Sequence, residues 1–189
     1  MLNTGIFENY SRLVSARAGD ARVRSIACAR SKGGALPALF EVDSDTFSKS
    51  PELGEEVFGP SSLVVRYETR EQILAIARSM EGNLTATIYA GPNDGELAKE
   101  LIGVLETKVG RILFEGFPTG VEVCQAMVHG GPYPATSDGR STSVGGRAID
   151  RFVRPVCYQD APEAMLPEEL RDSNPAGILR IVNGERRRA

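Results

Sequence analysis

Hydrophobic residues recur every three or four positions between Gly5 and Ala18, which predicts a helix, and Gly19 stands where a helix would end. The next two apolar stretches, RVRSIACA and ALPALFEV, are short and rich in residues that favour strands. Turn-forming residues, SKGG, separate them. The pattern therefore predicts one helix followed by a hairpin.

The middle of the chain shows the most regular pattern. SSLVVRYE contains three consecutive apolar residues, which is typical of a strand covered on both faces. Thr69 and Gln72 match a capping box at the start of a helix, and Gly82 with Asn83 match its end. The sequence then predicts a strand at LTATIYA.

A second helix and a third strand follow. Asn93 is a candidate cap for a helix whose apolar residues include Leu97, Leu101 and Leu105, and RILFE predicts the strand. The order strand, helix, strand, helix, strand, with short connections, requires right-handed crossovers. We therefore expect a mostly parallel sheet flanked by helices, which is the α/β class.

The third predicted strand runs directly into a long loop, residues 116–146, that is rich in Gly, Pro, Ser and Thr. Ligands of open α/β sheets bind beyond the carboxyl ends of the strands, and long loops in compact domains are often functional. This loop is therefore the predicted site region. After it, RFVRPVCYQ predicts one more strand, the prolines beyond Asp160 predict short helical turns in a tail, and the basic end ERRRA is expected to be solvated.

Charge and cysteine content narrow the function classes. A formal net charge of -3 gives no field that would attract nucleic acid or an acidic membrane surface. The opening residues lack the features of a signal peptide, and no stretch has the length of a membrane span, so we expect a soluble cytoplasmic protein. Three cysteines at irregular spacing and a single histidine fit reduced thiols rather than disulfides or a histidine-based metal site.

Candidate chemistry lies in and before the long loop. Cys124 and His129 could form a nucleophile and its base, as in a small cysteine hydrolase, although their spacing matches no known motif and a buried thiol is the commoner role. Arg140, among hydroxyl residues, could hold a substrate carboxylate or could lie on the surface. The sequence contains no G-x-G-x-x-G and no phosphate loop.

The segment EEVFGP, residues 55–60, precedes the first strand of the predicted sheet. Taken alone, its two glutamates are typical of a solvated turn, Phe58 of a core ring, and Gly59 with Pro60 of a tight turn. The longer stretch PELGEEVFGPSSLVV, however, resembles the E-E-x-F-G-P segment of the aldehyde dehydrogenase superfamily. The blocks GFPTGVEV and HGGPYPATSD are similar to one branch of it, the NADP-preferring 2-oxoglutarate semialdehyde (2,5-dioxovalerate) dehydrogenases.

This resemblance implies roles for particular residues. Glu56 would bind the nicotinamide ribose and Phe58 would pack near the nicotinamide ring, both held by the Gly-Pro turn at the ligand-binding end of the sheet. Pro118, Thr119, Gly120 and His129 would line the aldehyde pocket. Glu115 stands where many members of the family carry asparagine.

The resemblance also implies what the chain lacks and what it joins. The cysteine nucleophile and the coenzyme-binding domain match nothing in this sequence, so it assigns no catalytic residue and no metal here. Residues 1–150 would be the C-terminal portion of the catalytic domain, and residues 151–189 an oligomerisation strand and tail. We expect part of an NADP- or NAD-dependent dehydrogenase, inactive alone, that acts on a semialdehyde in a homo-oligomer or with a complementing subunit. A non-catalytic assembly module is the alternative.

Overall fold

The computed structural model describes residues 2–28 and 34–188. These residues form two compact units, Met1–Arg151 and Phe152–Ala189. The first unit contains the predicted α/β elements, and the second contains the tail.

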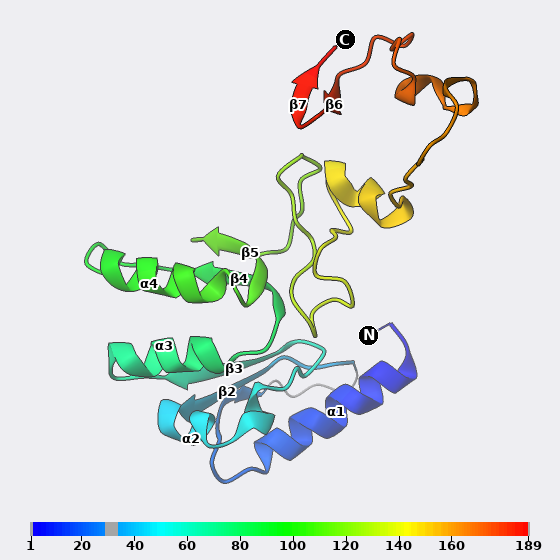
Figure 1. Ribbon diagram of the computed structural model, residues 1–189. Coiled ribbons are helices and arrows are strands. Elements are labelled where there is room, and N and C mark those ends of the chain that lie inside the picture. The colour runs from blue at the N-terminus through cyan, green and yellow to red at the C-terminus, as the bar shows by residue number, and fades with distance from the viewer. Residues whose placement is uncertain (1, 29–33, 189) are drawn as a thin grey trace. The chain divides into compact units, whose positions relative to one another are not determined.

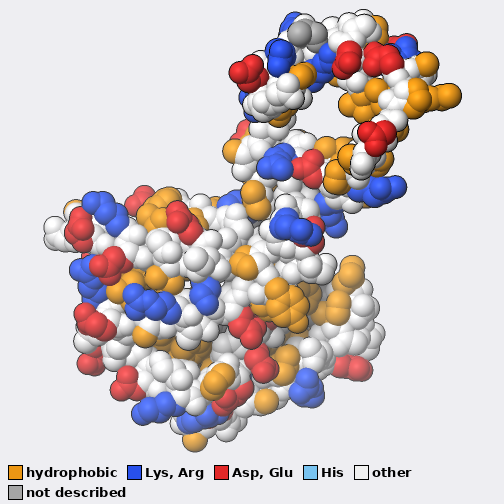
Figure 2. Space-filling view, viewed as in Figure 1, with side chains coloured by type: hydrophobic (Ala, Val, Ile, Leu, Met, Phe, Trp, Pro, Cys, Tyr) orange, Lys and Arg blue, Asp and Glu red, His pale blue; other side chains and the backbone are white. Residues whose placement is uncertain are grey.

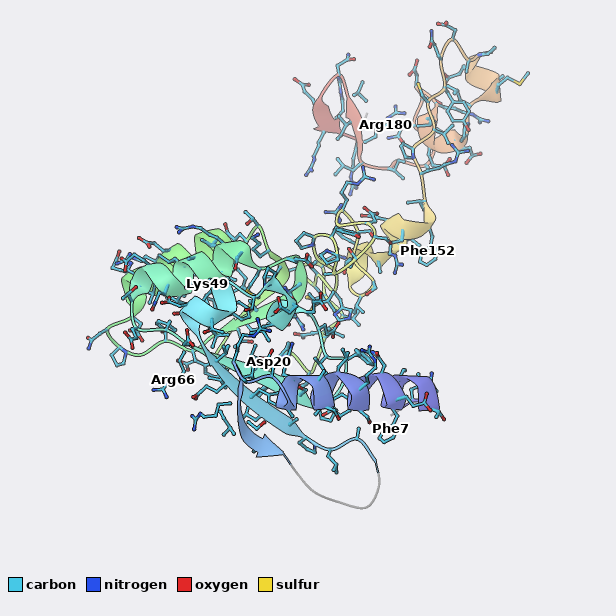
Figure 3. The ribbon with its side chains drawn as sticks, turned by 90° about the horizontal axis from the view of Figure 1, so that it is seen from below. Phe7, Asp20, Lys49, Arg66, Phe152 and Arg180 are labelled. Atoms are coloured by element: carbon cyan, nitrogen blue, oxygen red, sulfur yellow. The ribbon has the colours of Figure 1, made fainter. Side chains whose placement is uncertain are left out.

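Helix α1 (Thr4–Ala18) confirms the first predicted element. It begins where the Asn3 side chain accepts a hydrogen bond from the backbone N–H of Ile6 at 2.9 Å, as expected of an N-cap. Its Tyr10 side chain is buried against the rest of the unit, with 3% of its surface exposed. Figure 3 labels Phe7 and Asp20 near the two ends of this helix.

Strands β1 (Arg24–Cys28), β2 (Ala38–Asp43) and β3 (Ser61–Arg66) form one mixed sheet in this order. β1 and β2 are antiparallel, as the predicted hairpin requires, while β2 and β3 are parallel. Most of the SKGG turn between β1 and β2 lies outside the described residues. Every second residue of β2 is buried: Ala38, Phe40 and Val42. This alternation directs one face of the strand into the core.

The main hydrophobic core lies against this sheet. It contains Val23, Ala38, Phe40, Val42 and Leu53, with Val14, Phe47, Leu63 and Val65 packed against it. Phe40 is fully buried at 0% exposure. α2 (Ser44–Ser48) and the short 3-10 helix η1 (Pro51–Gly54) connect β2 to the segment before β3.

Helix α3 (Arg70–Ser79) begins with the predicted capping box. The backbone N–H of Gln72 donates to the Thr69 hydroxyl at 3.3 Å, and the Thr69 N–H donates to Gln72 Oε1 at 3.1 Å. The predicted end at Gly82 and Asn83 is wrong, because Met80 already adopts an extended conformation and Asn83 begins the next strand.

Strands β4 (Asn83–Ile88) and β5 (Val109–Phe114) are parallel and joined by α4 (Gly95–Leu105). Asp94 rather than Asn93 occupies the cap position of α4, and its carboxylate accepts a hydrogen bond from the Gly91 N–H at 2.8 Å. α3 packs against α4, and the two helices lie side by side in Figure 1.

The expected single sheet is not formed. β4 and β5 make a separate two-stranded sheet, and β3 ends the first sheet without pairing to β4. The expectation that β3 is covered on both faces is also wrong, since its residues alternate between half-buried and exposed and Val64 is 40% exposed. One face of β3 is therefore only partly covered by the described residues.

The second unit lacks one predicted strand and contains a hairpin that was not predicted. Residues 153–159 of RFVRPVCYQ form no strand, because no strand of the described residues lies beside them to pair with. The basic end is exposed to solvent over residues 185–188, as expected. It also forms an element that was not predicted, a hairpin of Arg180–Val182 (β6) and Glu185–Arg187 (β7). The turn residues Asn183 and Gly184 both have positive φ, 52° and 84°, which is the geometry that an Asn-Gly pair favours in a hairpin.

The short helical turns predicted in the tail are present as the 3-10 helices η3 (Glu163–Met165) and η4 (Glu168–Leu170). A further 3-10 helix, η2 (Gly146–Phe152), ends the long loop. Among the described residues, no helix is both long and apolar enough to cross a bilayer.

Candidate functional site

The EEVFGP segment is held at its C-terminal end by two elements. The Tyr10 hydroxyl of α1 donates to the Pro60 carbonyl at 3.1 Å and lies 2.5 Å from the Leu36 carbonyl. The Ala38 N–H of β2 also donates to the Pro60 carbonyl, at 2.9 Å. These contacts fix the turn at Gly59 and Pro60, so the residues before it project from a defined position.

Glu56 and Phe58 both lie exposed in this segment, and Phe58 is 61% exposed. The interpretation of Phe58 as a core ring is therefore wrong. The placement at the ligand-binding, carboxyl end of the sheet is wrong as well, because the segment leads into β3 and so lies at the amino ends of β2 and β3.

An open groove of about 630 Å³ borders this segment. It is lined by Ile26, Ala27, Pro37, Ala38, Leu39, Pro60 and Ser62. The lining is mostly apolar, with the Ser62 hydroxyl as a polar group.

The predicted substrate residues 118–120 are held by a strand residue. Arg111 of β5 donates from Nη1 to the Gly120 carbonyl at 2.9 Å and from Nη2 to the Pro118 carbonyl at 3.2 Å. Its Nη1 also lies 3.7 Å from the sulfur of Met127. One guanidinium thus contacts both the start of the loop and its middle, while Pro118, Thr119 and Gly120 are exposed.

His129 is fixed through its backbone. Its N–H donates to the hydroxyl of Thr142 at 2.8 Å, and its carbonyl accepts from the Ser143 N–H at 3.0 Å. Thr142 is 6% exposed. The His129 Nδ1 atom is buried and has no hydrogen-bond partner among the described residues.

The loop after His129 passes very close to the amino ends of β4 and β5. A Cβ atom at Gly110 would lie 2.1 Å from the Gly130 carbonyl oxygen, and one at Gly82 would lie 2.3 Å from the Pro132 carbonyl oxygen. Only glycine permits such approaches of two backbones. The predicted site loop therefore starts at the carboxyl end of β5 and returns to its amino end.

The exit from β5 has a strained conformation. Glu115 has φ 50°, in the left-handed region, and its N–H donates to the Ile88 carbonyl of β4 at 3.1 Å. Asparagine tolerates this region better than glutamate does. The asparagine that the resemblance places here would suit this backbone.

The proposed Cys124 and His129 pair is not formed, since no hydrogen bond joins them in the described part of the chain and Cys124 is exposed and free. Arg140 is also solvated, with a side-chain exposure of 94%, and it pairs with Asp138 at 3.4 Å. The Arg140 N–H, together with the Ser141 hydroxyl, lowers the pKa of the Asp138 carboxyl. The Thr142 and Ser143 hydroxyls bond to the loop backbone rather than to Arg140.

The candidate residues lie in two separate groups. One is Glu56 with Phe58, and the other is the loop held by Arg111. Arg111 brings Pro118, Gly120 and Met127 together. Across residues 2–28 and 34–188, no hydrogen bond or ion pair links Glu56 or Phe58 to that loop, and no group of three or more His, Cys, Asp or Glu side chains could hold a metal ion.

The sequence interpretation missed the residues that hold these groups, Tyr10, Arg111 and Thr142. The role of Arg111 could have been inferred from the sequence, because a charged residue inside an apolar strand requires polar partners. The roles of Tyr10 and Thr142 could not have been inferred, since their partners are backbone carbonyls and amides that are distant in the sequence.

The chain is similar in sequence to known enzymes. No protein-family model matches the chain. It is 47% identical over 188 residues, 97% of its length, to an alpha-ketoglutaric semialdehyde dehydrogenase of Acinetobacter baylyi. It is 52% identical over 148 residues, 78% of its length, to alpha-ketoglutaric semialdehyde dehydrogenase 2 of Azospirillum brasilense.

The chain spans 36% and 28% of the lengths of these two relatives, about a third. Among solved structures, it is similar to lactaldehyde dehydrogenase from Escherichia coli, with a TM-score of 0.64 and 22% identity over 85% of this chain and 32% of that one. It is also similar to the Delta-pyrroline-5-carboxylate dehydrogenase from Mycobacterium tuberculosis bound with NAD, with a TM-score of 0.62 and 16% identity over 88% of this chain and 31% of that one. These similarities show that the fold matches part of theirs.

Proposed function

Since this chain is a partial aldehyde dehydrogenase superfamily chain, we propose that it supplies pocket walls and a ribose-binding carboxylate to an enzyme that oxidises a semialdehyde to the acid. The observation that carries the proposal is the 47% identity, over nearly the whole chain, to an alpha-ketoglutaric semialdehyde dehydrogenase. The proposed substrate is that semialdehyde, 2,5-dioxovalerate, and the proposed cofactor is NADP or NAD.

The cofactor fits the EEVFGP segment. Glu56 is exposed at a turn that Tyr10 and Ala38 hold in place, and a carboxylate can accept hydrogen bonds from two ribose hydroxyls at once. Phe58 is 61% exposed beside it, so its ring is free to pack against a flat group. When bound, the nicotinamide would accept the hydride that leaves the substrate carbon.

The loop held by Arg111 supports the role of pocket wall. Pro118, Thr119 and Gly120 are exposed, while their backbone is held by two hydrogen bonds from the guanidinium. A wall of this kind positions a substrate without taking part in bond formation. His129, with its backbone held by Thr142, would form a second part of the wall.

We place the bond-forming thiolate outside this chain. Cys124 and Cys157 are both exposed and free, and neither has a base within hydrogen-bond distance among the residues described. A cysteine nucleophile requires a group that stabilises its thiolate. The chain would therefore be inactive alone.

The test is an assay of NAD(P)-dependent oxidation of 2,5-dioxovalerate. We expect no turnover by the chain alone, and turnover after mixing with the part of the Acinetobacter baylyi enzyme that the match leaves out, prepared as a separate polypeptide. Turnover by the chain alone that is lost in Cys124→Ser would contradict the proposal.

In that mixture, Glu56→Gln should raise KM for NADP about tenfold or more, because a hydrogen bond to a charged group contributes about 1.5 to 3 kcal/mol. Glu55→Gln is the matched control, since Glu55 is the neighbouring exposed glutamate. It should leave KM unchanged. An equal effect of both variants would remove the specific role of Glu56.

A second role, subunit assembly, is favoured by the start of the second unit. Phe152, at the end of η2, and Val153, Val156 and Tyr158 after it are exposed. Residues 153–159 form no helix and pair with no strand among the described residues. Orange side chains gather on this unit in Figure 2. We propose that this segment adds as a strand to another dehydrogenase subunit, and Val156→Lys should abolish co-purification with that subunit.

A further inference from the structure

Helix α1 contacts the chain on both sides of the proposed coenzyme residues. At the C-terminal end of the EEVFGP segment, the Tyr10 hydroxyl contacts the Pro60 carbonyl at 3.1 Å. Just before the segment, Arg17 donates from Nη2 to the Leu53 carbonyl of η1, also at 3.1 Å. The Leu53 side chain is buried, at 5% exposure. One helix therefore holds the backbone before and after the segment.

The two contacts come from one face of α1. Tyr10, Val14 and Arg17 are four and three positions apart, a spacing that places their side chains on the same side of a helix. Tyr10 is buried, and Val14 packs against the core cluster that contains Leu53. The helix is thus attached to the core between its two contacts, so it can serve as a fixed support for both.

Residues 56–58 have no support of their own. None of them forms a hydrogen bond or an ion pair with any part of residues 2–28 and 34–188. In the same part of the chain, the carbonyls of Leu53 and Pro60 are the nearest groups on either side that a side chain of another element holds. The position of residues 56–58 therefore depends on these two carbonyls.

A binding carboxylate needs such a fixed position. Side chains that bind a ligand specifically are held within about 0.5 Å of the productive geometry, and Glu56 would have to meet two ribose hydroxyls at once. We propose that Arg17 and Tyr10 are positioning residues, which fix this segment from α1 and so set the affinity for the coenzyme. This inference rests on the proposed function of Glu56.

Backbone dynamics of the full chain test the first step without an enzyme assay. Arg17→Met keeps an unbranched apolar side chain and removes the donors. The NMR order parameters of the Glu56 and Phe58 amides should fall towards the range below about 0.6 that flexible backbone shows. Arg12→Met is the matched control, because Arg12 is an exposed arginine of the same helix that bonds to Asn9 at 2.7 Å. It should change neither value.

The second step is measured in the mixture with the remaining part of the Acinetobacter baylyi enzyme. Arg17→Met should raise KM for NADP about fivefold, as expected for the loss of one hydrogen bond, and leave KM for the aldehyde unchanged. Arg17→Lys keeps the charge and a donor, so its effect should be smaller. A rise of equal size in both KM values would overturn the positioning role.

A double-mutant cycle tests whether Arg17 acts through Glu56. In a Glu56→Gln background, Arg17→Met should raise KM for NADP no further, because the carboxylate that it positions is already absent. Tyr10→Phe, which removes the hydroxyl at the other end and retains the ring, should behave in the same way. If the effects of Arg17→Met and Glu56→Gln multiply instead, Arg17 does not act through Glu56 and the proposal is overturned.

The outcomes separate this proposal from the proposed function. If Glu56→Gln leaves KM for NADP unchanged while Arg17→Met lowers the order parameters, the ribose role of Glu56 is wrong and the attachment of the segment by α1 stands. If Glu56→Gln raises KM while Arg17→Met changes neither KM nor the order parameters, the proposed function stands and this proposal is overturned. Without turnover in the mixture, the order parameters alone decide on the attachment.

Discussion

The chain up to Val109 and the chain beyond it are stabilised by different interactions. Every buried hydrophobic residue in the described structure lies at or before Val109. Beyond it, the buried side chains are the polar Thr142 and Asn174, and their partners are backbone groups. The first region excludes water with apolar surface, whereas the second is shaped by hydrogen bonds.

This difference shows which region has less apolar burial of its own. Burial of apolar area is the main favourable term in folding, and a hydrogen bond adds only about 1 kcal/mol. Exposed hydrophobic residues in the second region include Phe117, Tyr133, Phe152 and Met165. Their burial by a partner would supply what the region lacks.

The largest expected effect is at the centre of the first region. Phe40→Ala should lower the free energy of unfolding by about 3 to 5 kcal/mol, because Phe40 is fully buried and its removal leaves a cavity. Urea denaturation measures this loss. Phe152→Ala, at a residue 79% exposed, is the control, and a loss of similar size there would mean that the second region has a core of its own.

A smaller effect is expected at Asn174, whose side chain donates to the Ile178 carbonyl and accepts from its N–H, both at 3.1 Å. Asn174→Gly keeps the left-handed backbone, φ 45°, and removes both bonds, so local opening of the tail should become easier by about 2 kcal/mol. Hydrogen exchange at Ile178 reports it. Ser173→Gly should have less effect, and a matching change in global unfolding would contradict the separation of the regions.

A substitution at Glu115, close to the boundary between the two regions, should increase the stability of the protein. Glu115→Asn should raise the free energy of unfolding by about 0.5 to 1 kcal/mol, since Glu115 occupies the left-handed region at φ 50°. Thermal denaturation measures the gain. Glu106→Asn, at φ -54°, should give no gain, and equal shifts in both variants would exclude relief of strain as the cause.

The smallest effect depends on pH and belongs to the first region. Hydrogen bonds from Arg22 lower the pKa of Asp20 to about 2. Since the folded pKa lies below the ordinary value of about 4, this contribution is present above pH 4 and is lost as the pH falls towards 2. The difference in Tm between the original chain and Asp20→Asn should therefore shrink over that interval, and a constant difference would contradict this role.

Local elements were predictable from the sequence because their signals are local. The helix predicted between Gly5 and Ala18, the capping box of Thr69 and Gln72, and the parallel pair β4 and β5 are all present. The division into separate sheets was not, because strand pairing depends on neighbours that periodicity does not specify. The strand expected at RFVRPVCYQ was wrong for the same reason.

The candidate site was predictable only in part. Motif resemblance indicated Glu56, Phe58, Pro118, Thr119, Gly120 and His129, and their roles stay predictions. The residues that hold them in place were not predicted, since the hydrogen bond from Tyr10 to Pro60 joins residues 50 positions apart. The β6 and β7 hairpin was not predicted, although Asn183 and Gly184 form a pair that favours this turn.

The bond from Arg111 to the carbonyls of Pro118 and Gly120 has a consequence for protein engineering. The shape of residues 118–120 is encoded partly in a strand that precedes them. If residues 118–120 were transplanted alone into another protein of this fold, they would lack these two hydrogen bonds unless an arginine were introduced at the equivalent strand position. The transferable unit is therefore strand and loop together.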